Sequence, residues 1–334
     1  MGDVAIAVPV VYALCRRYPR VKVIFVTRRP FDALFVDAPS NLTVLTADLK
    51  GADKGLGGIM SFTRKIISEY RPAAFADLHD VLRTKAMRIV CRLSGIKTAH
   101  IDKGRAEKRL LTRQGAQIFG RQLKTSSERY ADVLRKLGYD TAGSDTTVLR
   151  HTVPGSNPPR IGIAPFAAHP GKAYPAEKME QVVQELVREG ANIWLFGAPG
   201  REQQTLDSWA ADAPDSIISV PSLRLGLQEE LRLMATLHVM VAMDSGNMHM
   251  ASMAATPTVS VWGATHPFAG FTAPSATPEL RAEVPLPCRP CSVFGNKPCR
   301  LADTPYACLN NITPDMIVDR VKRALAAGAC TPDN

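Results

Sequence analysis

The segment Asp244-Ser245-Gly246 has the residue types and spacing of an anion-binding turn. It follows the apolar run 238–243 and precedes a stretch with helical spacing of apolar residues. Ligands of open α/β sheets bind at the carboxyl ends of the strands, where the free amides and positive dipole end of the next helix attract anions. Ser245 or Asp244 can cap that helix, and Gly246 lets backbone approach a ligand closely. His249 lies in the first helical turn. The pattern predicts a site for a nucleotide diphosphate, against the simpler alternative of a plain helix cap with a core-facing histidine.

Two other loops of the second half are predicted to lie at the same sheet edge. Lys172 belongs to a loop that follows the strand-like run 160–164, and its point charge suits phosphate oxygens. Gly197 opens the Gly-Ala-Pro-Gly turn after the strand-like run 192–196 and allows another close backbone approach. These loops contain neither a Walker Gly-x4-Gly-Lys-Ser/Thr motif nor Gly-x-Gly-x-x-Gly, which disfavours a P-loop enzyme or a standard NAD domain.

The elements that must position these loops alternate between strand and helix. In the second half, short runs rich in β-branched and aromatic residues alternate with helical periodicity, which predicts a parallel, doubly wound sheet. The first half has the same alternation. The stretch 141–159 is rich in Gly, Ser, Thr and Pro, so we place the linker there. The sequence therefore predicts two domains, residues 1–150 and 151–334. The predicted strands are 22–27, 42–46, 73–78, 160–164, 192–196, 238–243 and 258–262, and the main predicted helices are 4–18, 59–70, 82–93, 176–190, 229–237 and 247–255.

Composition and charge narrow the class of protein. The 334 residues are 46% hydrophobic and 22% charged, as in soluble globular proteins of two domains. Apolar runs are too short to cross a bilayer, and the N-terminus lacks the features of a signal peptide, so we expect a cytoplasmic protein. The net charge of +10 is concentrated in residues 1–150, which carry 27 Lys and Arg against 14 Asp and Glu. The first half is therefore expected to meet an anionic partner, such as a nucleic acid, an acidic membrane surface or a phosphorylated glycolipid, unless this is only a solvated basic face.

Four cysteines lie close together near the C-terminus: Cys288, Cys291, Cys299 and Cys308. Cys288-x2-Cys291 has the spacing of a zinc knuckle, but the second pair is too far apart for another knuckle. Reduced structural thiols, a zinc site and disulfides remain open as interpretations.

These residues, taken in order, resemble glycosyltransferase family 9, the ADP-heptose:lipopolysaccharide heptosyltransferases. The resemblance covers nearly the whole chain. It rests on Gly2-Asp3-Val4 with Pro9 and Tyr18-Pro19, Asp77-Leu78 with Arg83, Lys172 with Tyr174-Pro175, Phe196-Gly197, Asp244-Ser245-Gly246 with His249 and Ala251, Val261–Thr265 with Pro267, and the four cysteines.

The resemblance implies an α/β fold of GT-B type, in which two Rossmann-like domains face a central cleft. The N-terminal domain of such enzymes takes the acceptor, and the C-terminal domain takes the nucleotide sugar. Family members usually have a first strand before the Gly-Asp-Val segment, whereas this sequence begins at Met1. The resemblance therefore predicts that the first strand is missing from the acceptor-binding domain and that its sheet lacks a central strand.

The family reaction inverts the anomeric centre and requires no metal or other cofactor. Asp3 matches the catalytic base, and Lys172, with the helix beginning near Gly246 and with His249, matches the groups that stabilise the leaving diphosphate. Glu202 matches an acidic nucleoside contact. The acceptor candidates of the first domain are Asp77, His79 and Arg83.

The predicted function is transfer of a heptose from ADP-heptose to the inner core of lipopolysaccharide. The expected partners are ADP-heptose and an anionic glycolipid, with peripheral contact at the inner membrane and no nucleic acid. A related enzyme using another nucleotide sugar and a catalytically inactive nucleotide-binding homologue are alternatives. A basic, zinc-containing nucleic-acid-binding protein is disfavoured, because the basic residues and the cysteines lie in different halves and no nucleic-acid-binding motif is recognisable.

Overall fold

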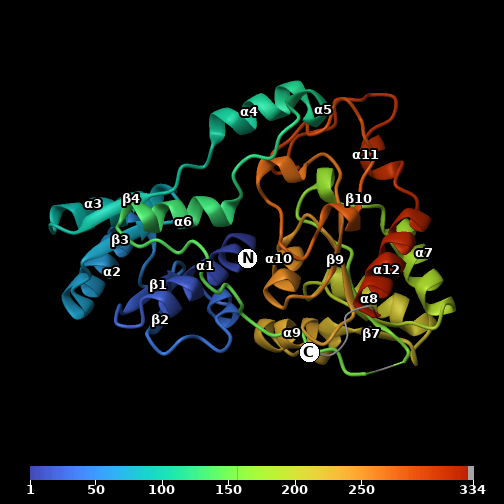
Figure 1. Ribbon diagram of the computed structural model, residues 1–334, viewed down its shortest axis with the longest axis horizontal. Helices are drawn as coiled ribbons and strands as arrows, with labels where there is room; N and C mark the ends of the chain where they lie inside the picture. Colours follow the sequence, from blue (N-terminus) through green and yellow to red (C-terminus); the bar gives the residue numbers. More distant parts are fainter. Residues whose placement is uncertain (156, 330–334) are drawn as a thin grey trace. The chain divides into compact units, whose positions relative to one another are not determined.

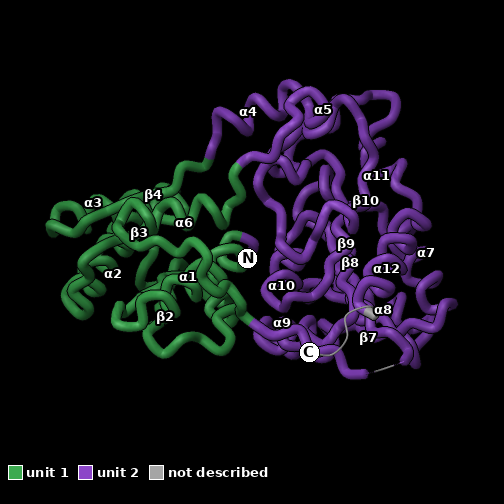
Figure 2. Tube along the Cα trace, viewed as in Figure 1, with its two compact units in different colours: residues 1, 3–103, 124–148 green, residues 2, 104–123, 149–334 purple. Residues whose placement is uncertain are grey.

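The computed structural model describes residues 1–155 and 157–329, which form two compact units (Figure 2). Unit 1 comprises Met1, Asp3–Lys103 and Lys124–Val148, and unit 2 comprises Gly2, Gly104–Leu123 and the chain from Leu149 onward. The predicted first domain, residues 1–150, thus includes the segment Gly104–Leu123, which belongs to unit 2.

Unit 2 contains a six-stranded parallel sheet in the order β10-β9-β8-β5-β6-β7. Its strands are β5 (Arg160–Ala164), β6 (Asn192–Leu195), β7 (Ile217–Ser219), β8 (Val239–Met243), β9 (Thr258–Val261) and β10 (Arg281–Ala282). Its helices are α4 (Arg105–Gln114), α5 (Ala116–Phe119), α7 (Ala176–Arg188), α8 (Arg201–Asp212), α9 (Leu227–Met234), α10 (Gly246–Met253), α11 (Ala307–Asn310) and α12 (Pro314–Ala329) (Figure 1).

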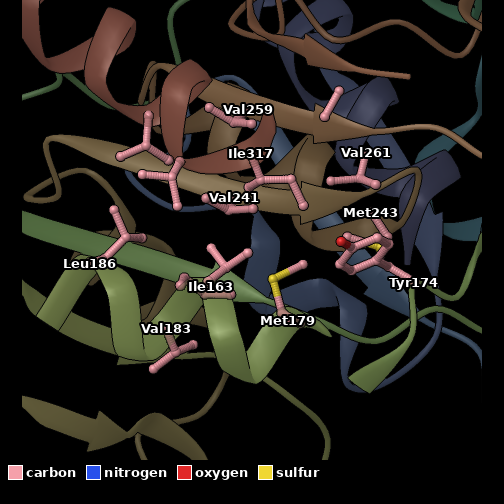
Figure 3. Packing of buried hydrophobic residues seen from close by; sticks show 14 of the residues in the cluster. Ile163, Tyr174, Met179, Val183, Leu186, Val241, Met243, Val259, Val261 and Ile317 are labelled. Carbon is pink, nitrogen blue, oxygen red and sulfur yellow. The ribbon is translucent and has the colours of Figure 1, made fainter. Parts of the chain in front are cut away.

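The core of unit 2 lies between this sheet and the helices that follow its strands. Met179 and Val183 of α7 lie in one buried cluster with Ile163 of β5, Val241 of β8 and Ile317 of α12 (Figure 3). The strands are buried on both faces, which explains why β8 reads as a continuous apolar run rather than an alternating one.

The strand order of unit 2 reverses between β5 and β8. The chain moves from β5 outward through β6 to β7, and then returns to place β8 on the other side of β5. Loops leaving β5 and β8 at their carboxyl ends diverge at such a switch point and leave room for a ligand. The loop bearing Lys172 and the turn bearing Asp244 are these two loops.

The segment Gly104–Leu123, which contains α4 and α5, is attached to unit 2 by apolar packing and by backbone hydrogen bonds. Leu111, Ala116 and Leu123 form a buried cluster with Ala269. The Leu123 amide donates to the Phe268 carbonyl at 3.0 Å.

Unit 1 contains two separate sheets rather than one continuous sheet. Its four strands form two separate parallel pairs: β1 (Val23–Thr27) with β2 (Leu42–Thr46), and β3 (Ala74–Asp77) with β4 (Lys97–His100). Residues of both pairs nevertheless pack around one buried cluster, which includes Val10 of α1 and Val133 of α6. The helices of unit 1 are α1 (Gly2–Arg17), α2 (Gly55–Tyr70), α3 (Leu82–Leu93) and α6 (Ser126–Lys136).

Several of the predicted elements agree closely with the structure. The strand 160–164 and the helix 82–93 have the predicted bounds. Gly95 follows α3 with φ +76°, as expected for a glycine just after a helix end. Among the described helices, none has both the length and the hydropathy to span a bilayer.

Candidate functional site

The switch point of unit 2 brings Lys172 and Asp244 into direct contact. Lys172 Nζ lies 2.8 Å from Asp244 Oδ2, and the two side chains are only 14% and 3% exposed. The oxygen makes no hydrogen bond of acceptable angle, so the contact is an ion pair rather than a well-aligned hydrogen bond. A partly buried ammonium with two N–H donors beyond this contact is suited to an anionic ligand.

The N-terminus of α10 lies directly beyond Asp244. Ser245 is the N-cap residue, but its side chain makes no capping hydrogen bond, and its buried hydroxyl oxygen has no partner among the described residues. The Thr265 hydroxyl, in the loop after the neighbouring strand β9, is likewise buried and without a partner in that part of the chain. An unpaired hydroxyl at the N-cap and the first amides of the helix that begins at Gly246 are groups of the kind that bind phosphate oxygens. His249 lies in the first turn of α10 and is buried.

Close backbone packing fixes the loop that carries Lys172. A Cβ atom on Gly171 would lie 2.7 Å from the Gly295 carbonyl oxygen, and one on Gly263 would lie 2.6 Å from the Gly171 carbonyl oxygen. Gly295 has φ +74°, and a Cβ there would meet the Lys172 side chain at 2.6 Å. Only glycine fits this packing, which holds the Lys172 stem against the turn containing Gly295.

Hydrogen bonds join the same three segments. The Ala264 amide donates to the Gly171 carbonyl at 2.7 Å, and the Gly171 amide donates to the Gly295 carbonyl at 3.1 Å. The Cys291 amide donates to the Ala264 carbonyl at 3.1 Å. Backbone hydrogen bonds therefore connect the loop after β5 to the loop after β9 and to the cysteine-bearing segment.

Tyr174 anchors the other end of the lysine loop. Its buried hydroxyl donates to the Ile312 carbonyl at 2.9 Å. Burial raises the pKa of Tyr174 to about 12, so the hydroxyl stays protonated and remains a donor.

Arg289, which sequence reasoning did not single out as a site residue, holds the loop after β9. Its guanidinium is buried and donates to the carbonyls of Gly263 at 2.6 Å, Trp262 at 3.1 Å and Thr265 at 3.3 Å. It also forms an ion pair with Glu283 at 2.9 Å. A guanidinium holds five donors in a rigid planar fork and can bind several carbonyls of one loop in fixed directions, whereas a lysine ammonium has three donors on a flexible stem.

His266 shares the same charged cluster and supplies a prediction about pH. Burial lowers the pKa of His266 to about 4, and the positive Arg289 acts in the same direction while Glu283 opposes it. An unfolded histidine titrates near pH 6.5. Between these values the unfolded chain binds a proton that the folded chain does not bind. The contribution of His266 to the free energy of unfolding is therefore complete above about pH 6.5, and about 3 kcal/mol is lost as the pH drops to about 4.

The His266→Asn variant tests this expectation. Asparagine retains an acceptor for the Phe268 amide, which His266 Nδ1 accepts at 3.1 Å, but does not titrate. Urea unfolding at pH 7 and pH 5, followed by tryptophan fluorescence, should show a smaller pH dependence in the variant than in the native chain. An equal pH dependence in the variant and in the native chain would show that His266 is not the group responsible.

Glu202, in the first turn of α8, lies beside Gly197 in the turn that follows β6. Glu202 Oε2 accepts a hydrogen bond from the Ala198 amide at 2.7 Å, so one carboxylate oxygen is used to close the turn before α8. A Cβ on Gly197 would approach Leu206 at 2.9 Å and Glu202 Oε2 at 3.3 Å, which explains the glycine. The structure thus gives Glu202 a local role in addition to the predicted nucleoside contact.

In unit 1, the structure brings together two candidates that are far apart in the sequence. His79 Nε2 lies 3.5 Å from Asp3 Oδ2, and both side chains are largely exposed. Asp3 lies in the first turn of α1, and His79 lies in the loop between β3 and α3. An exposed carboxylate beside an imidazole is an arrangement able to accept a proton from a bound hydroxyl group.

Asp77 stabilises the loop that carries His79. Its carboxylate is fully buried and accepts hydrogen bonds from the amides of His79 at 3.0 Å and Asp80 at 2.7 Å. Arg88 Nη1 donates to the second oxygen at 3.1 Å. Asp77 therefore shapes the turn that presents His79, whereas Arg83 is exposed at the start of α3.

Asp80 is the second carboxylate that pairs with Arg88. Its desolvation would raise the pKa of the carboxyl group, but Lys85 and Arg88 outweigh that effect and lower the pKa. Asp80 therefore stays ionised and holds Arg88, with an Arg88 Nη2 to Asp80 Oδ1 distance of 3.3 Å.

The four clustered cysteines are free thiols. Burial raises the pKa of Cys291, and it raises the pKa of Cys308 to about 11; the other cysteines of the cluster act on both thiols in the same direction. Across residues 1–155 and 157–329, no group of three or more His, Cys, Asp or Glu side chains is arranged to hold a metal ion.

Solved structures similar to this chain share its fold. A family 9 glycosyltransferase from Veillonella parvula matches over 98% of this chain and 95% of its own length, with a TM-score of 0.72 and 18% identity. E. coli heptosyltransferase WaaC with ADP matches over 97% of both chains, with a TM-score of 0.67 and 17% identity. The iron-containing dodecameric glycosyltransferase TibC from enterotoxigenic E. coli matches over 98% of this chain and 74% of its own, with a TM-score of 0.56 and 14% identity. These likenesses confirm the predicted α/β fold of GT-B type.

No curated protein sequence matches this chain. The sequence model of glycosyltransferase family 9 (heptosyltransferase), by contrast, matches residues 107–298, which include Lys172, Asp244 and Arg289. That match spans more than half of the 334 residues and agrees with the resemblance seen in the sequence. The chain is therefore a glycosyltransferase and belongs to glycosyltransferase family 9.

Proposed function

We propose that this enzyme transfers a heptose from ADP-heptose to the inner core of lipopolysaccharide, with inversion at the anomeric carbon. The observation that carries the proposal is the ion pair between the partly buried Lys172 and the buried Asp244 at the switch point, next to the N-terminus of α10, which has no side-chain cap. The Ser245 hydroxyl, at the N-cap of α10, has no partner in the described chain, and a phosphate oxygen would satisfy it. The family and the likeness to WaaC, which was solved with ADP, support ADP as the nucleotide.

In the proposed reaction, Asp3 removes the proton from an acceptor hydroxyl group. The hydroxyl oxygen attacks the anomeric carbon while the bond from that carbon to the β-phosphate oxygen breaks, and ADP leaves with the electron pair. Charge accumulates on the diphosphate, where the Lys172 ammonium and the amides of α10 stabilise it. We propose that no metal takes part, which retention of turnover in excess EDTA would test.

Unit 1 is proposed to bind the acceptor. Asp3 and His79 supply groups for the reacting hydroxyl, and the exposed Arg83 supplies positive charge for an anionic glycolipid. The excess of positive charge in residues 1–150 supports an anionic acceptor. Because that acceptor is a lipid of the inner membrane, we propose a cytoplasmic enzyme in peripheral contact with the membrane.

Nucleotide binding is the first test. Calorimetry with ADP, UDP and GDP should show the tightest binding for ADP, and Lys172→Ala should weaken ADP binding by roughly 10- to 100-fold, because a charge-assisted hydrogen bond to phosphate is lost. Lys178→Ala is a matched control in the same unit, since this exposed lysine donates to the Asn310 carbonyl away from the switch point. Equal affinity for all three nucleotides would rule out the ADP assignment.

The Lys172 substitution also leaves Asp244 without its cation. The double variant Lys172→Ala/Asp244→Asn removes that unpaired buried charge and separates loss of phosphate contact from local destabilisation. The double variant should fold as stably as the native chain and still bind ADP weakly.

Sugar transfer to core-truncated lipopolysaccharide tests the reaction itself. Incorporation of heptose from ADP-heptose is the expected result. Binding of ADP without transfer from any nucleotide sugar would instead identify an inactive homologue, and transfer from a different nucleotide sugar would reassign the donor.

A further inference from the structure

The helix α3 exposes a line of large apolar side chains. Leu82, Ile89 and Leu93 are 69%, 54% and 83% exposed, although α3 packs on α2, β3 and β4 (Figure 1). Their separations of seven and four residues place them on one side of the helix. The side that faces the core carries Met87, Val90 and Cys91 instead, which are buried. We call the exposed line Leu82–Ile89–Leu93 the α3 ridge.

Positive charge flanks the α3 ridge. Residues 81–101 contain five Lys and Arg and no acidic residue. Arg88 points toward the core, where it pairs with Asp77 and Asp80. Lys85 and Arg92 are exposed, and helical spacing places both beside the ridge. The surface is therefore apolar along its centre and basic along its margin.

We propose that the α3 ridge docks on the surface of a bilayer that contains anionic phospholipids. Apolar side chains flanked by lysine and arginine are the pattern of a helix that lies in a membrane interface, where the apolar groups enter the acyl boundary and the cations meet phosphate headgroups. A second copy of the same surface is a poorer partner, because like charges would face each other across the interface. With only three large apolar groups, the contact is weak and reversible.

Docking of the α3 ridge would bring the loop between β3 and α3 to the lipid surface. Leu82 begins α3, and His79, which lies 3.5 Å from Asp3, is in the loop just before it. An acceptor sugar anchored in the same bilayer would then be presented near the proposed base. This consequence rests on the proposed function, whereas the docking itself does not.

Vesicle co-sedimentation tests the docking. The native chain should sediment with vesicles of phosphatidylcholine containing phosphatidylglycerol and much less with pure phosphatidylcholine. Leu82→Ser/Ile89→Ser/Leu93→Ser and Lys85→Gln/Arg92→Gln should each lower the partition coefficient at least about tenfold. The control Leu223→Ser/Leu225→Ser, at exposed leucines of unit 2, should bind as the native chain does.

Three outcomes would overturn the proposal: no binding of the native chain to anionic vesicles, undiminished binding of the triple serine variant, or conversion of a native dimer to a monomer by that variant. Far-ultraviolet circular dichroism should confirm that the variants are folded.

Sugar transfer separates this inference from the proposed function. The serine variant should keep full turnover with a soluble core oligosaccharide and lose turnover with acceptor embedded in vesicles. Ridge-dependent vesicle binding by a chain that transfers no sugar would refute the proposed function and leave the docking surface standing. Equal loss with soluble and embedded acceptor would refute the docking role in catalysis.

Discussion

The Asp3→Asn variant is expected to lose about 10²- to 10⁴-fold in kcat, the usual contribution of a general base. Asparagine has the same shape but cannot accept the proton of the acceptor hydroxyl. The Asp3 side chain is largely exposed, so the substitution should change the free energy of unfolding by no more than about 0.5 kcal/mol. The KM for the nucleotide sugar should hardly change, because the groups proposed to bind it belong to unit 2.

The measurement is initial-rate kinetics with saturating acceptor, compared with Asp145→Asn. Asp145 is another exposed aspartate of unit 1, where it pairs with Arg16 at 2.9 Å, and its amide variant should keep native kcat. Full turnover in Asp3→Asn would place the base elsewhere. A similar loss in both variants would point to a general effect of charge in unit 1 rather than to proton removal.

Arg289→Ala is expected to give the largest loss of stability, about 3–5 kcal/mol. The substitution leaves Glu283 without its buried partner and removes donors from the carbonyls of Trp262, Gly263 and Thr265. Arg289→Lys should recover only part of the loss, because an ammonium cannot reach these carbonyls as a planar fork does.

Urea unfolding followed by tryptophan fluorescence reports this effect selectively. The three tryptophans, Trp194, Trp209 and Trp262, all lie in unit 2. Arg300→Ala, at an exposed arginine of the same cysteine-bearing segment, should change the free energy of unfolding by less than about 0.5 kcal/mol. A loss below about 1 kcal/mol in Arg289→Ala would show that the loop after β9 holds its shape without the guanidinium.

The regular elements of unit 2 could be predicted from the sequence because their signals are local. β8 and β5 are short apolar runs bounded by turn residues, and α7 has the apolar periodicity of a helix with one buried face. The segment containing α4 and α5 could not be assigned to unit 2 in this way. Its burial depends on packing against Ala269 and other residues far along the chain. A local sequence pattern does not predict such long-range contacts.

The sequence predicted that the loops of the candidate site lie at the same edge of one sheet, and no finer detail. The positions of Lys172 and Asp244 after two strands indicated that both lie at the carboxyl ends, but the ion pair between them depends on β5 and β8 being neighbours. Arg289 was missed as a site residue because no local pattern shows that it binds the carbonyls of Trp262, Gly263 and Thr265, which lie more than twenty residues away. Asp77 was predicted as an acceptor contact, and its burial among turn amides emerges only from the folded loop.

The two small sheets of unit 1 should make this unit less resistant to heat than unit 2. A two-stranded sheet leaves an unpaired edge on each strand and protects few amides, whereas the six-stranded sheet of unit 2 has four interior strands. Amides of β1 to β4 should therefore exchange with deuterium sooner than those of β5 and β8, through local opening at lower free energy. On heating, the enzyme should stop turning over while it still binds nucleotide, because the unit that carries the proposed base loosens first.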